Sequence, residues 1–292
     1  MKQYKRAYLE ITNVCNLNCS FCPKTTRSPH FLSLEEFRFA AAQIRNFTNF
    51  LQFHVMGEPL LHPLLGEFLE ECQRLNFKVN LTTNGTLLKG DTARTILSSP
   101  AVHKVCISLH SFEANTLPFS MEEYLTQITQ FSKAASAQGN LLTQLRLWNL
   151  DGETSQGQHQ ENPWILSFLE QAFSMDAPIR PTGKEQRDIR LAPNTYLHFA
   201  HKFEWPDPIQ PISEKTVFCQ ALRDHFAVLC DGTVIPCCLD SEGRIPLGNL
   251  FSSPLEEILS GTRAQAIYQG FSDRKPFEEL CRRCSYASRF QK

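Results

Sequence analysis

The sequence contains 292 residues, 42% of them apolar, and carries a formal net charge of −1 at pH 7. A chain of this length can build one large domain, or one domain with a smaller appendage, around a sizeable core. The near-neutral charge provides no general basic field, which argues against nucleic acid and anionic membranes as partners.

The N-terminal segment and the hydropathy pattern show no signal for export or membrane insertion. The first residues contain no uninterrupted apolar run of the kind that a signal peptide needs. No stretch of about 18 apolar residues could form a membrane-spanning helix. We therefore expect a cytoplasmic protein, in which the 11 cysteines stay reduced and are available as metal ligands.

Strands and helices are predicted to alternate up to about residue 175. Strands are predicted at residues 7–12, 50–55, 78–83, 104–109 and 142–148. Helices are predicted at residues 34–46, 62–76, 91–98, 121–138 and 163–174. The first helix begins with a capping box formed by Ser33 and Glu36. The alternation indicates repeated βαβ units around a parallel sheet, and hence the α/β class, with chemistry on the loops that follow the strands.

Beyond residue 175 the pattern changes, because several prolines interrupt it. One further strand is predicted near residues 187–191 or 195–200. We place a domain boundary near residue 212, which gives a first domain at 1–211 and a second at 212–292. The second domain is expected to contain short strands, one helix and six cysteines.

The cysteines fall into two groups. The first group is Cys15, Cys19 and Cys22, and the second is Cys219, Cys230, Cys237, Cys238, Cys281 and Cys284. Cys72 and Cys106 lie apart from both groups, on a predicted helix and a predicted strand, and are expected to be core thiols.

The first group has the spacing Cys-x3-Cys-x2-Cys on one short loop. Three thiolates can hold three irons of a 4Fe–4S cluster and leave the fourth iron open for an added ligand. A structural zinc site is the alternative, but zinc normally takes four protein ligands and this loop offers three.

The run from Cys15 to Cys22, CNLNCSFC, resembles the cysteine motif of the radical S-adenosylmethionine (SAM) family. In that family the amino and carboxylate groups of SAM chelate the open iron. The resemblance implies that Phe21 lies beside the adenine. It also implies a partial (β/α)6 TIM-like barrel with a small C-terminal α+β iron–sulfur domain of the SPASM or Twitch type.

Gly57-Glu58-Pro59 follows the second predicted strand and resembles the family's GGEP loop, although Met56 replaces the first glycine. The resemblance implies that the backbone of this loop and Glu58 hold the SAM amino group. Its position, one βα unit after the cysteines, supports the assignment.

Further candidate SAM contacts follow the later strands. The resemblance implies that Thr83, Asn84 and Ser108 contact the methionyl or ribose part of SAM, although ordinary strand-end and turn chemistry would also explain them. Arg146 lies within an apolar run, where a charge needs a partner such as the SAM carboxylate unless its side chain faces the surface. His110 is a candidate acid, base or substrate contact, or else a structural histidine.

The second group of cysteines resembles the SPASM and Twitch extensions, which carry auxiliary 4Fe–4S clusters. The incomplete cysteine run after Cys284 supports one auxiliary cluster, with Cys219, Cys237, Cys281 and Cys284 as its ligands. Adjacent strand residues point in opposite directions, and the Gly-x4-Cys spacing favours Cys237 over Cys238. A structural zinc site on the same four cysteines is the alternative.

The resemblance implies that the reduced first cluster donates one electron to SAM, which is cleaved to methionine and a 5′-deoxyadenosyl radical. The radical then abstracts a hydrogen atom from the substrate, while the protein orients the reactants. We expect a net oxidation or modification of a small molecule or a peptide, assisted by the auxiliary cluster. A reducing partner such as flavodoxin or ferredoxin would supply the electron.

Three other functions stay open. Peptide or protein modification, including sulfatase maturation, is a common outcome of this extension, but few residues precede the first cysteine loop, so we expect no leader-recognition domain there. Nucleoside or tRNA modification agrees less well with the near-neutral charge. A non-enzymatic electron carrier agrees less well with the open-iron triad and Glu58.

Overall fold

The computed structural model describes residues 2–148, 162–180, 188–200, 204–212 and 217–290. The chain falls into two compact units. The first unit comprises Met1–Val14, Pro23–Lys78 and Phe203–Lys292, and the second comprises Cys15–Cys22 and Val79–Lys202. Each unit combines stretches that are far apart in the sequence, whereas the predicted boundary cuts the chain once, at residue 212. That boundary stays a prediction.

The first unit contains a mixed set of strands. Its strands are β1 (Arg6–Leu9), β2 (Phe50–Phe53), β8 (His225–Val228), β9 (Thr233–Ile235) and β10 (Gly248–Asn249). β1 pairs in parallel with both β2 and β8, whereas β8, β9 and β10 pair with one another in antiparallel order. The strand that leads to the first cysteine is therefore hydrogen-bonded to the strand that leads to Cys230.

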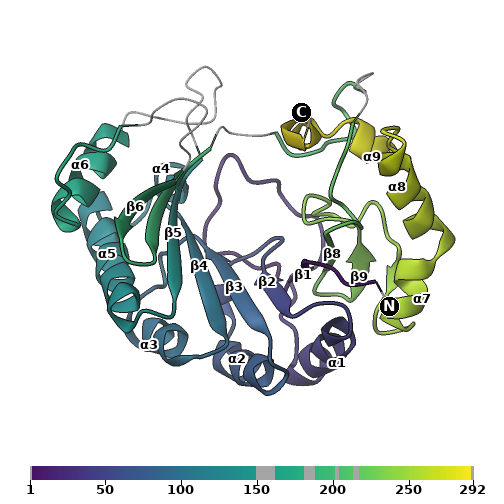
Figure 1. Ribbon diagram of the computed structural model, residues 1–292, viewed down its shortest axis with the longest axis horizontal. Helices are drawn as coiled ribbons and strands as arrows, with labels where there is room; N and C mark the ends of the chain where they lie inside the picture. Colours follow the sequence, from purple (N-terminus) through teal and green to yellow (C-terminus); the bar gives the residue numbers. More distant parts are fainter. Residues whose placement is uncertain (1, 149–161, 181–187, 201–203, 213–216, 291–292) are drawn as a thin grey trace. The chain divides into compact units, whose positions relative to one another are not determined.

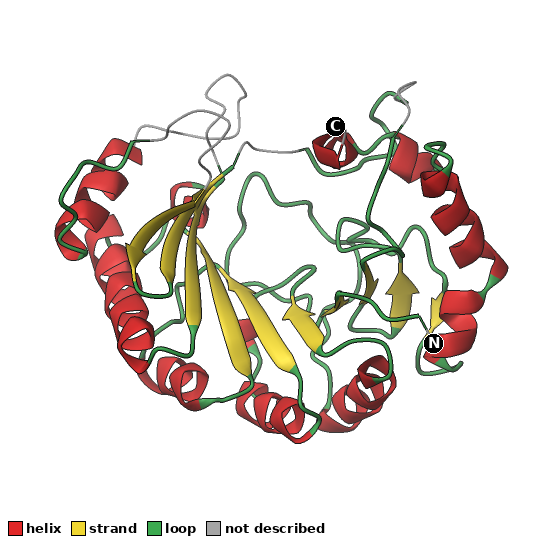
Figure 2. Cartoon of the chain, in the orientation of Figure 1, coloured by secondary structure: helices red, strands yellow, loops and turns green. Residues whose placement is uncertain are grey.

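The helices of the first unit come from both ends of the chain. They are α1 (Leu34–Arg45), η1 (Pro59–Leu61), α2 (Leu65–Arg74), α7 (Leu255–Ser260), α8 (Thr262–Ser272), α9 (Glu279–Arg282) and η2 (Ser285–Phe290). In Figure 2, α7 and α8 follow one another along one side of β8 and β9. The expectation of a single helix after residue 212 is wrong, because α7 and α8 are separate helices that meet at Gly261, whose ψ of 156° is extended.

The second unit is built from parallel strands with helices on one side. Its strands are β3 (Lys78–Thr83), β4 (Val102–Ser108), β5 (Leu142–Leu147), β6 (Asp188–Ala192) and β7 (Thr195–Phe199). β3, β4, β5 and β7 pair in parallel in that order, and β6 pairs antiparallel to β7. Its helices are α3 (Gly90–Ser98), α4 (His110–Glu113), α5 (Met121–Gln138) and α6 (Asn162–Ala172). Figure 1 shows α3, α5 and α6 along one side of these strands.

Local sequence signals explain where the helices begin and end. Ser33 and Glu36 form the predicted capping box of α1, and Ser120 and Glu123 form another at α5. α5 ends at Gly139, whose φ of 79° is left-handed and favours glycine. The predicted strands and helices up to residue 174 are all present, and the two alternative strands after it are both formed, as β6 and β7.

The strands of the second unit alternate between two faces. Leu81, Ile107 and Leu145 are fully buried, as expected for the face that the helices cover. Residues on the opposite face, such as Ser108 and Arg146, stay partly exposed. The α/β class with a mainly parallel sheet is therefore confirmed, and the chain presents a polar strand face on which a site can form.

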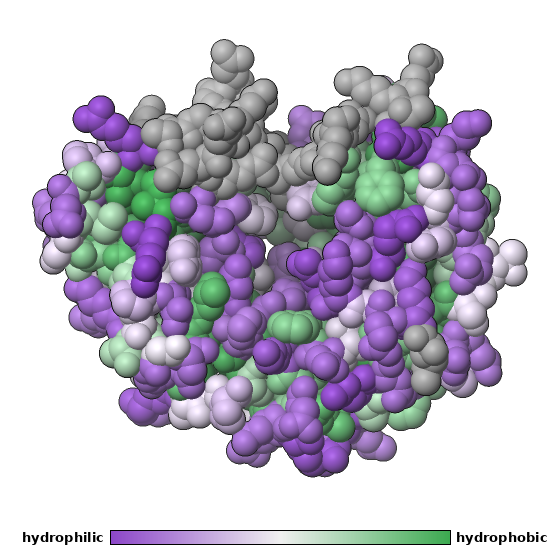
Figure 3. Space-filling model, viewed as in Figure 1, coloured by the Kyte–Doolittle hydropathy of each residue, from purple (hydrophilic) through white to green (hydrophobic). Residues whose placement is uncertain are grey.

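Apolar side chains lie mainly inside the units. The face shown in Figure 3 is covered mostly by hydrophilic residues, with hydrophobic ones in small groups between them. Among the residues that the structure describes, no helix is long and apolar enough to cross a membrane.

Two phenylalanines on α1 provide a test of this core. Phe37 is fully buried and stacks on Phe68 of α2 with ring centroids 4.0 Å apart, whereas Phe39 is 49% exposed. We expect Phe37→Ala to lower the free energy of unfolding by about 3–5 kcal/mol, because it removes buried surface and leaves a cavity. Phe39→Ala should lower it by less than about 1 kcal/mol. Equal effects in urea denaturation would contradict the packing described for α1.

Candidate active site

The cysteine loop of the second unit is fixed by amide side chains. Asn84, directly after β3, donates from Nδ2 to Asn16 Oδ1 at 2.9 Å, and the same nitrogen lies 3.9 Å from Cys15 Sγ. Asn16 in turn donates to Thr86 Oγ1 at 2.8 Å, and Thr86 donates back to Asn84 Oδ1. These contacts hold the first cysteine against the carboxyl end of β3.

A second amide holds the middle of the loop. Asn115, just after α4, donates to Cys19 Sγ at 3.2 Å and to the carbonyl of Ser111 at 2.7 Å. Its Oδ1 accepts from the backbone N–H of Asn18 at 2.8 Å. N–H donors to thiolate sulfur are a usual feature of iron–sulfur sites, where they influence the reduction potential. The sequence analysis missed Asn16, Thr86 and Asn115, although the asparagines of the cysteine run offered a signal.

The three thiols suit an iron–sulfur cluster. None of them is in a disulfide, Cys15 is exposed, and Cys19 and Cys22 are less so. In the described part of the chain, no group of three His, Cys, Asp or Glu side chains has the arrangement of a single-metal-ion site. A set of free thiols with amide donors at the sulfur is the donor set that a 4Fe–4S cluster takes.

Phe21 and His110 pack together beside the cysteine loop. Their ring centroids are 4.9 Å apart, and the His110 ring is nearly parallel to that of Trp148 at 6.5 Å. Burial lowers the pKa of His110 to about 4, so the ring is neutral near pH 7. The structure therefore brings together two predicted site residues, and a catalytic role for His110 stays a prediction.

Thr83, Asn84 and Ser108 lie at strand ends as predicted, but Thr83 already has a local role. Its Oγ1 accepts from the backbone N–H of Gly85 at 3.0 Å, which is ordinary turn chemistry. The carbonyl of Asn84 accepts from the hydroxyl of Tyr124 at 2.7 Å. Ser108 is paired in register with Arg146 on the neighbouring strand.

Arg146 is part of a polar network on the partly exposed strand face. Its guanidinium lies over the ring of Trp148 at 4.7 Å, and its Nε donates to Gln144 Oε1 at 3.2 Å. His198 Nδ1 lies 2.7 Å from Asp188 Oδ1, and Gln144 donates to the same oxygen at 3.4 Å. The sequence analysis missed this histidine–carboxylate pair, because β6 and β7 were predicted only as alternatives.

The Gly57-Glu58-Pro59 loop belongs to the first unit and is held against the chain just before Cys15. The backbone N–H of Glu58 donates to the carbonyl of Val14 at 2.8 Å. Gly57 has a φ of 76°, and a Cβ added there would lie 2.3 Å from the carbonyl oxygen of Thr12. Glycine is therefore required at position 57 for two independent reasons.

The side chain of Glu58 is buried and caps a short helix. Its Oε1 accepts from the backbone N–H of Leu60 at 3.1 Å, with Pro59 at the start of η1. This cap fixes the carboxylate and the loop backbone together. A rigid loop of this kind can present both to a cationic ligand group.

The predicted auxiliary ligands gather in the first unit. Burial, assisted by the neighbouring thiols of Cys238, Cys219, Cys281 and Cys284, raises the pKa of Cys237 well above its usual value. Burial also raises the pKa of Cys219 to about 11, and Cys284 is again a neighbour. Thiols from three distant chain segments therefore gather around Cys237, and none of them is in a disulfide, as a cluster held by four cysteines requires.

The two remaining cysteines of the second group have different surroundings. Burial raises the pKa of Cys238 to about 11, and its thiol is hydrogen-bonded to Tyr8 of β1 while lying near Cys219. Cys230 lies instead beside the ion pair of Glu10 and Arg27, with its Sγ 3.7 Å from Arg27 Nη1. Cys230 therefore has a charged neighbour pair, whereas the thiols of the predicted ligands are neighbours of Cys237.

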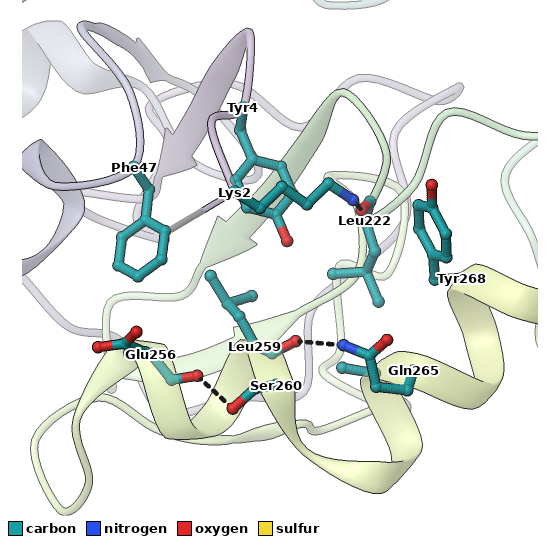
Figure 4. A pocket seen from close by; sticks show the side chains of 10 residues that line it. Lys2, Tyr4, Phe47, Leu222, Glu256, Leu259, Ser260, Gln265 and Tyr268 are labelled. Atoms are coloured by element: carbon teal, nitrogen blue, oxygen red, sulfur yellow. Dashed lines mark hydrogen bonds between the residues drawn. The ribbon is translucent and has the colours of Figure 1, made fainter.

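A separate pocket of about 360 Å³ lies in the first unit (Figure 4). Tyr4, Phe47, Leu259 and Tyr268 border it, and Lys2 lies over the ring of Tyr268 at 4.0 Å. It contains none of the predicted site residues, so it is distinct from the cysteine sites.

Two family models match the chain. The model of the radical SAM superfamily matches residues 9–155, and the SPASM model, described as an iron–sulfur cluster-binding domain, matches residues 219–285.

Among curated relatives, the antilisterial bacteriocin subtilosin biosynthesis protein AlbA of Bacillus subtilis (strain 168) is 24% identical over 310 residues. That alignment covers 95% of this chain and 66% of AlbA. A probable GTP 3′,8-cyclase of Methanothermobacter thermautotrophicus is 29% identical over 125 residues, covering 41% of this chain and 40% of the relative. A tungsten-containing aldehyde ferredoxin oxidoreductase cofactor-modifying protein of Pyrococcus furiosus is 29% identical over 96 residues, or 32% of this chain and 27% of that protein. The chain thus spans less than two thirds of the length of these relatives.

Solved structures share the fold over nearly the whole chain. BtrN in complex with AdoMet and 2-DOIA aligns with a TM-score of 0.60 and 13% identity, covering 98% of this chain and 94% of BtrN. Streptococcus suis SuiB bound to its precursor peptide SuiA aligns with a TM-score of 0.64 and 16% identity, covering 97% and 70%. The predicted fold, a partial TIM-like barrel followed by a small iron–sulfur domain, is confirmed.

The radical SAM model matches half of the chain, the SPASM model matches the segment that carries the second cysteine group, and the thiols of both segments suit iron–sulfur clusters. The cofactors of the chain are SAM and a 4Fe–4S cluster, and its C-terminal SPASM domain binds auxiliary iron–sulfur clusters. The chain therefore belongs to the radical SAM superfamily.

Proposed function

We propose that this protein is a radical SAM enzyme that removes a hydrogen atom from its substrate and completes a net oxidation or modification. The observation that carries the proposal is the Cys15–Cys22 loop, which offers three cysteines and is fixed by Asn84 and Asn115. With the cluster bound there, SAM supplies a 5′-deoxyadenosyl radical for the hydrogen abstraction. The protein residues bind, orient and enclose the reactants.

The residue roles follow from their contacts. Glu58 and the backbone at Gly57 are proposed to hold the SAM amino group, because the loop is rigid and its carboxylate is fixed by the cap at Leu60. Phe21 is proposed to contact the adenine. Arg146 is proposed to pair with the SAM carboxylate, because Trp148 and Gln144 hold its guanidinium at the end of β5.

Two histidines are candidates for proton transfer. His110 is neutral, and it packs between Phe21 and Trp148, so we propose that it supports the adenine contact and any proton transfer there. His198 has the stronger acid–base geometry, because Asp188 Oδ1 lies 2.7 Å from its Nδ1 and can orient the ring. We propose that His198 accepts a proton released by the substrate.

The substrate is proposed to be either a small molecule or a peptide. The BtrN structure with 2-DOIA, which aligns over nearly all of both chains, supports a small molecule. AlbA and the SuiB structure with a precursor peptide support peptide modification.

The four gathered thiols support one auxiliary cluster on Cys219, Cys237, Cys281 and Cys284. We propose a flavodoxin or ferredoxin as the source of the electron.

Reductive SAM cleavage tests the proposal. The anaerobic protein, reconstituted with iron and sulfide and reduced with dithionite, should form 5′-deoxyadenosine from SAM, measured by liquid chromatography. Cys19→Ala should abolish this product, because the cluster loses one of its three protein ligands. Cys72→Ala, which removes a buried thiol from α2, should keep it. An active Cys19→Ala variant, or an inactive reconstituted wild type, would refute the proposal.

Iron content tests the auxiliary ligands. The reconstituted wild type should hold about eight irons per chain, and Cys237→Ala should hold about four. Cys238→Ala is the matched control at the neighbouring residue and should hold about eight. The reverse pattern would show that Cys238 is the ligand. A wild type that holds about four irons and also zinc would show that the second site is a zinc site and not a cluster.

Gly57→Ala tests the loop that is proposed to hold SAM. A Cβ at this position meets the carbonyl of Thr12, so the loop must shift, and SAM should bind at least about tenfold more weakly in equilibrium dialysis. Gly139→Ala is the control, because Gly139 has a similar φ of 79° but nothing within 4 Å of the added Cβ. It should destabilise the protein by about 1 kcal/mol and leave SAM affinity unchanged. Equal SAM affinity in wild type and Gly57→Ala would contradict the loop assignment.

A further inference from the structure

The first unit contains a fully buried carboxylate, that of Glu10. Glu10 directly follows β1, and its side chain has no exposed surface. Its Oε1 accepts from Arg27 Nη1 at 2.7 Å and from the backbone N–H of Cys230 at 3.2 Å. Its Oε2 accepts from Arg27 Nη2 at 2.8 Å and from the backbone N–H of Met56 at 3.1 Å. Each oxygen therefore holds one arm of the same arginine and the amide of one loop.

Arg27 carries the same connection further along the chain. Its Nε donates to the carbonyl of Ser241 at 3.0 Å, and the neighbouring Thr26 donates twice to Glu242. Burial alone would lower the pKa of Arg27, but the hydrogen bonds with Glu10 raise it above its usual value. Glu10 and Arg27 thus form a charged pair that also binds backbone groups of Met56, Cys230 and Ser241.

The two amides that Glu10 binds lead into the two functional loops. Met56 directly precedes Gly57 and Glu58, which are proposed to hold SAM. Cys230 opens the turn at Gly232, which is followed by β9 and then by the auxiliary ligand Cys237. The sequence analysis assigned no role to Glu10 or to Arg27.

Stability alone does not explain such a pair. Taking two charges out of water carries a large desolvation cost, and well-packed apolar residues of similar volume often stabilise a protein equally well. What apolar residues cannot do is accept two backbone N–H groups, one from each loop, on one rigid carboxylate. The contacts of Glu10 therefore indicate that the pair fixes the positions of these two loops.

We propose that Glu10, held by Arg27, is a positioning residue that couples the Gly57–Pro59 loop to the SPASM hairpin at Cys230–Gly232. Movement of either loop displaces the carboxylate from the other. Tightening of the first loop by a ligand therefore tightens the second, and the coupling is reciprocal. The identity of that ligand as SAM rests on the proposed function, whereas the mechanical coupling does not.

Hydrogen–deuterium exchange of the full chain without cofactors tests the coupling directly. Glu10→Gln keeps the shape but places an amide NH₂ where one oxygen stood, facing Arg27. We expect exchange to become at least about tenfold faster at the amides of both Met56 and Cys230. Lys5→Gln is the matched control, because it breaks an exposed ion pair between the start of β1 and Asp224. It should change neither amide.

SAM binding to the reconstituted protein provides the second readout. SAM should slow exchange at the Cys230 amide in the wild type but not in Glu10→Gln, which should also bind SAM about tenfold more weakly. If Glu10→Gln does not fold, Arg27→Lys is used for the same measurements. This variant keeps the positive charge but loses the two-armed contact with the carboxylate.

The outcomes separate the two proposals. Faster exchange at one loop only, at neither loop, or equally in Lys5→Gln would overturn the coupling. A wild type that binds no SAM would refute the proposed function, and the exchange measured without cofactors would still decide whether Glu10 couples the loops.

Discussion

The ion pair of Glu10 and Arg27 is the interaction on which the order of the first unit depends. Glu10 and Arg27 lie on two chain segments and bind the backbone of three more, and none of the five has regular structure at that point. Backbone amides in such loops need partners when they are buried. One carboxylate supplies two of these partners, so the loop before Glu58 and the turn after Cys230 have fixed backbones without a helix or a strand to support them.

The second unit fixes its loop by neutral groups instead. Asn84 and Asn115 donate toward the sulfurs of Cys15 and Cys19 and at the same time bind the backbone or side chains of the loop. Amides suit this task because they hold the cysteines in place without adding a charge beside a cluster whose potential depends on nearby charge. The two units thus use different chemistry for the same purpose, which is to make irregular loops rigid.

The fold was largely predictable, because the period of apolar residues, the capping boxes and the turn residues all agree locally. Ser33, Ser120 and Gly139 mark helix ends by chemistry that needs no distant partner. The two groups of cysteines were recognisable from their spacing, and their assignment as cluster ligands stays a prediction. The supporting residues were not, because Glu10 and Arg27, or His198 and Asp188, gain their meaning only when distant segments meet. The single helix expected near the C-terminus is several helices, because the extended backbone at Gly261 separates α7 from α8 and the short helix α9 follows them.

The close contact at Gly57 has a consequence for how the loop tolerates change. Position 57 combines a left-handed backbone with a carbonyl oxygen in the place of a side chain, whereas Met56 has no such backbone and buries its side chain in the core. The two glycines of a GGEP loop are therefore unequal: here the first can be exchanged for a bulky residue and the second cannot. A chain that lacks the first glycine can therefore keep the backbone geometry of this loop, because only the second glycine combines a left-handed backbone with a close carbonyl contact.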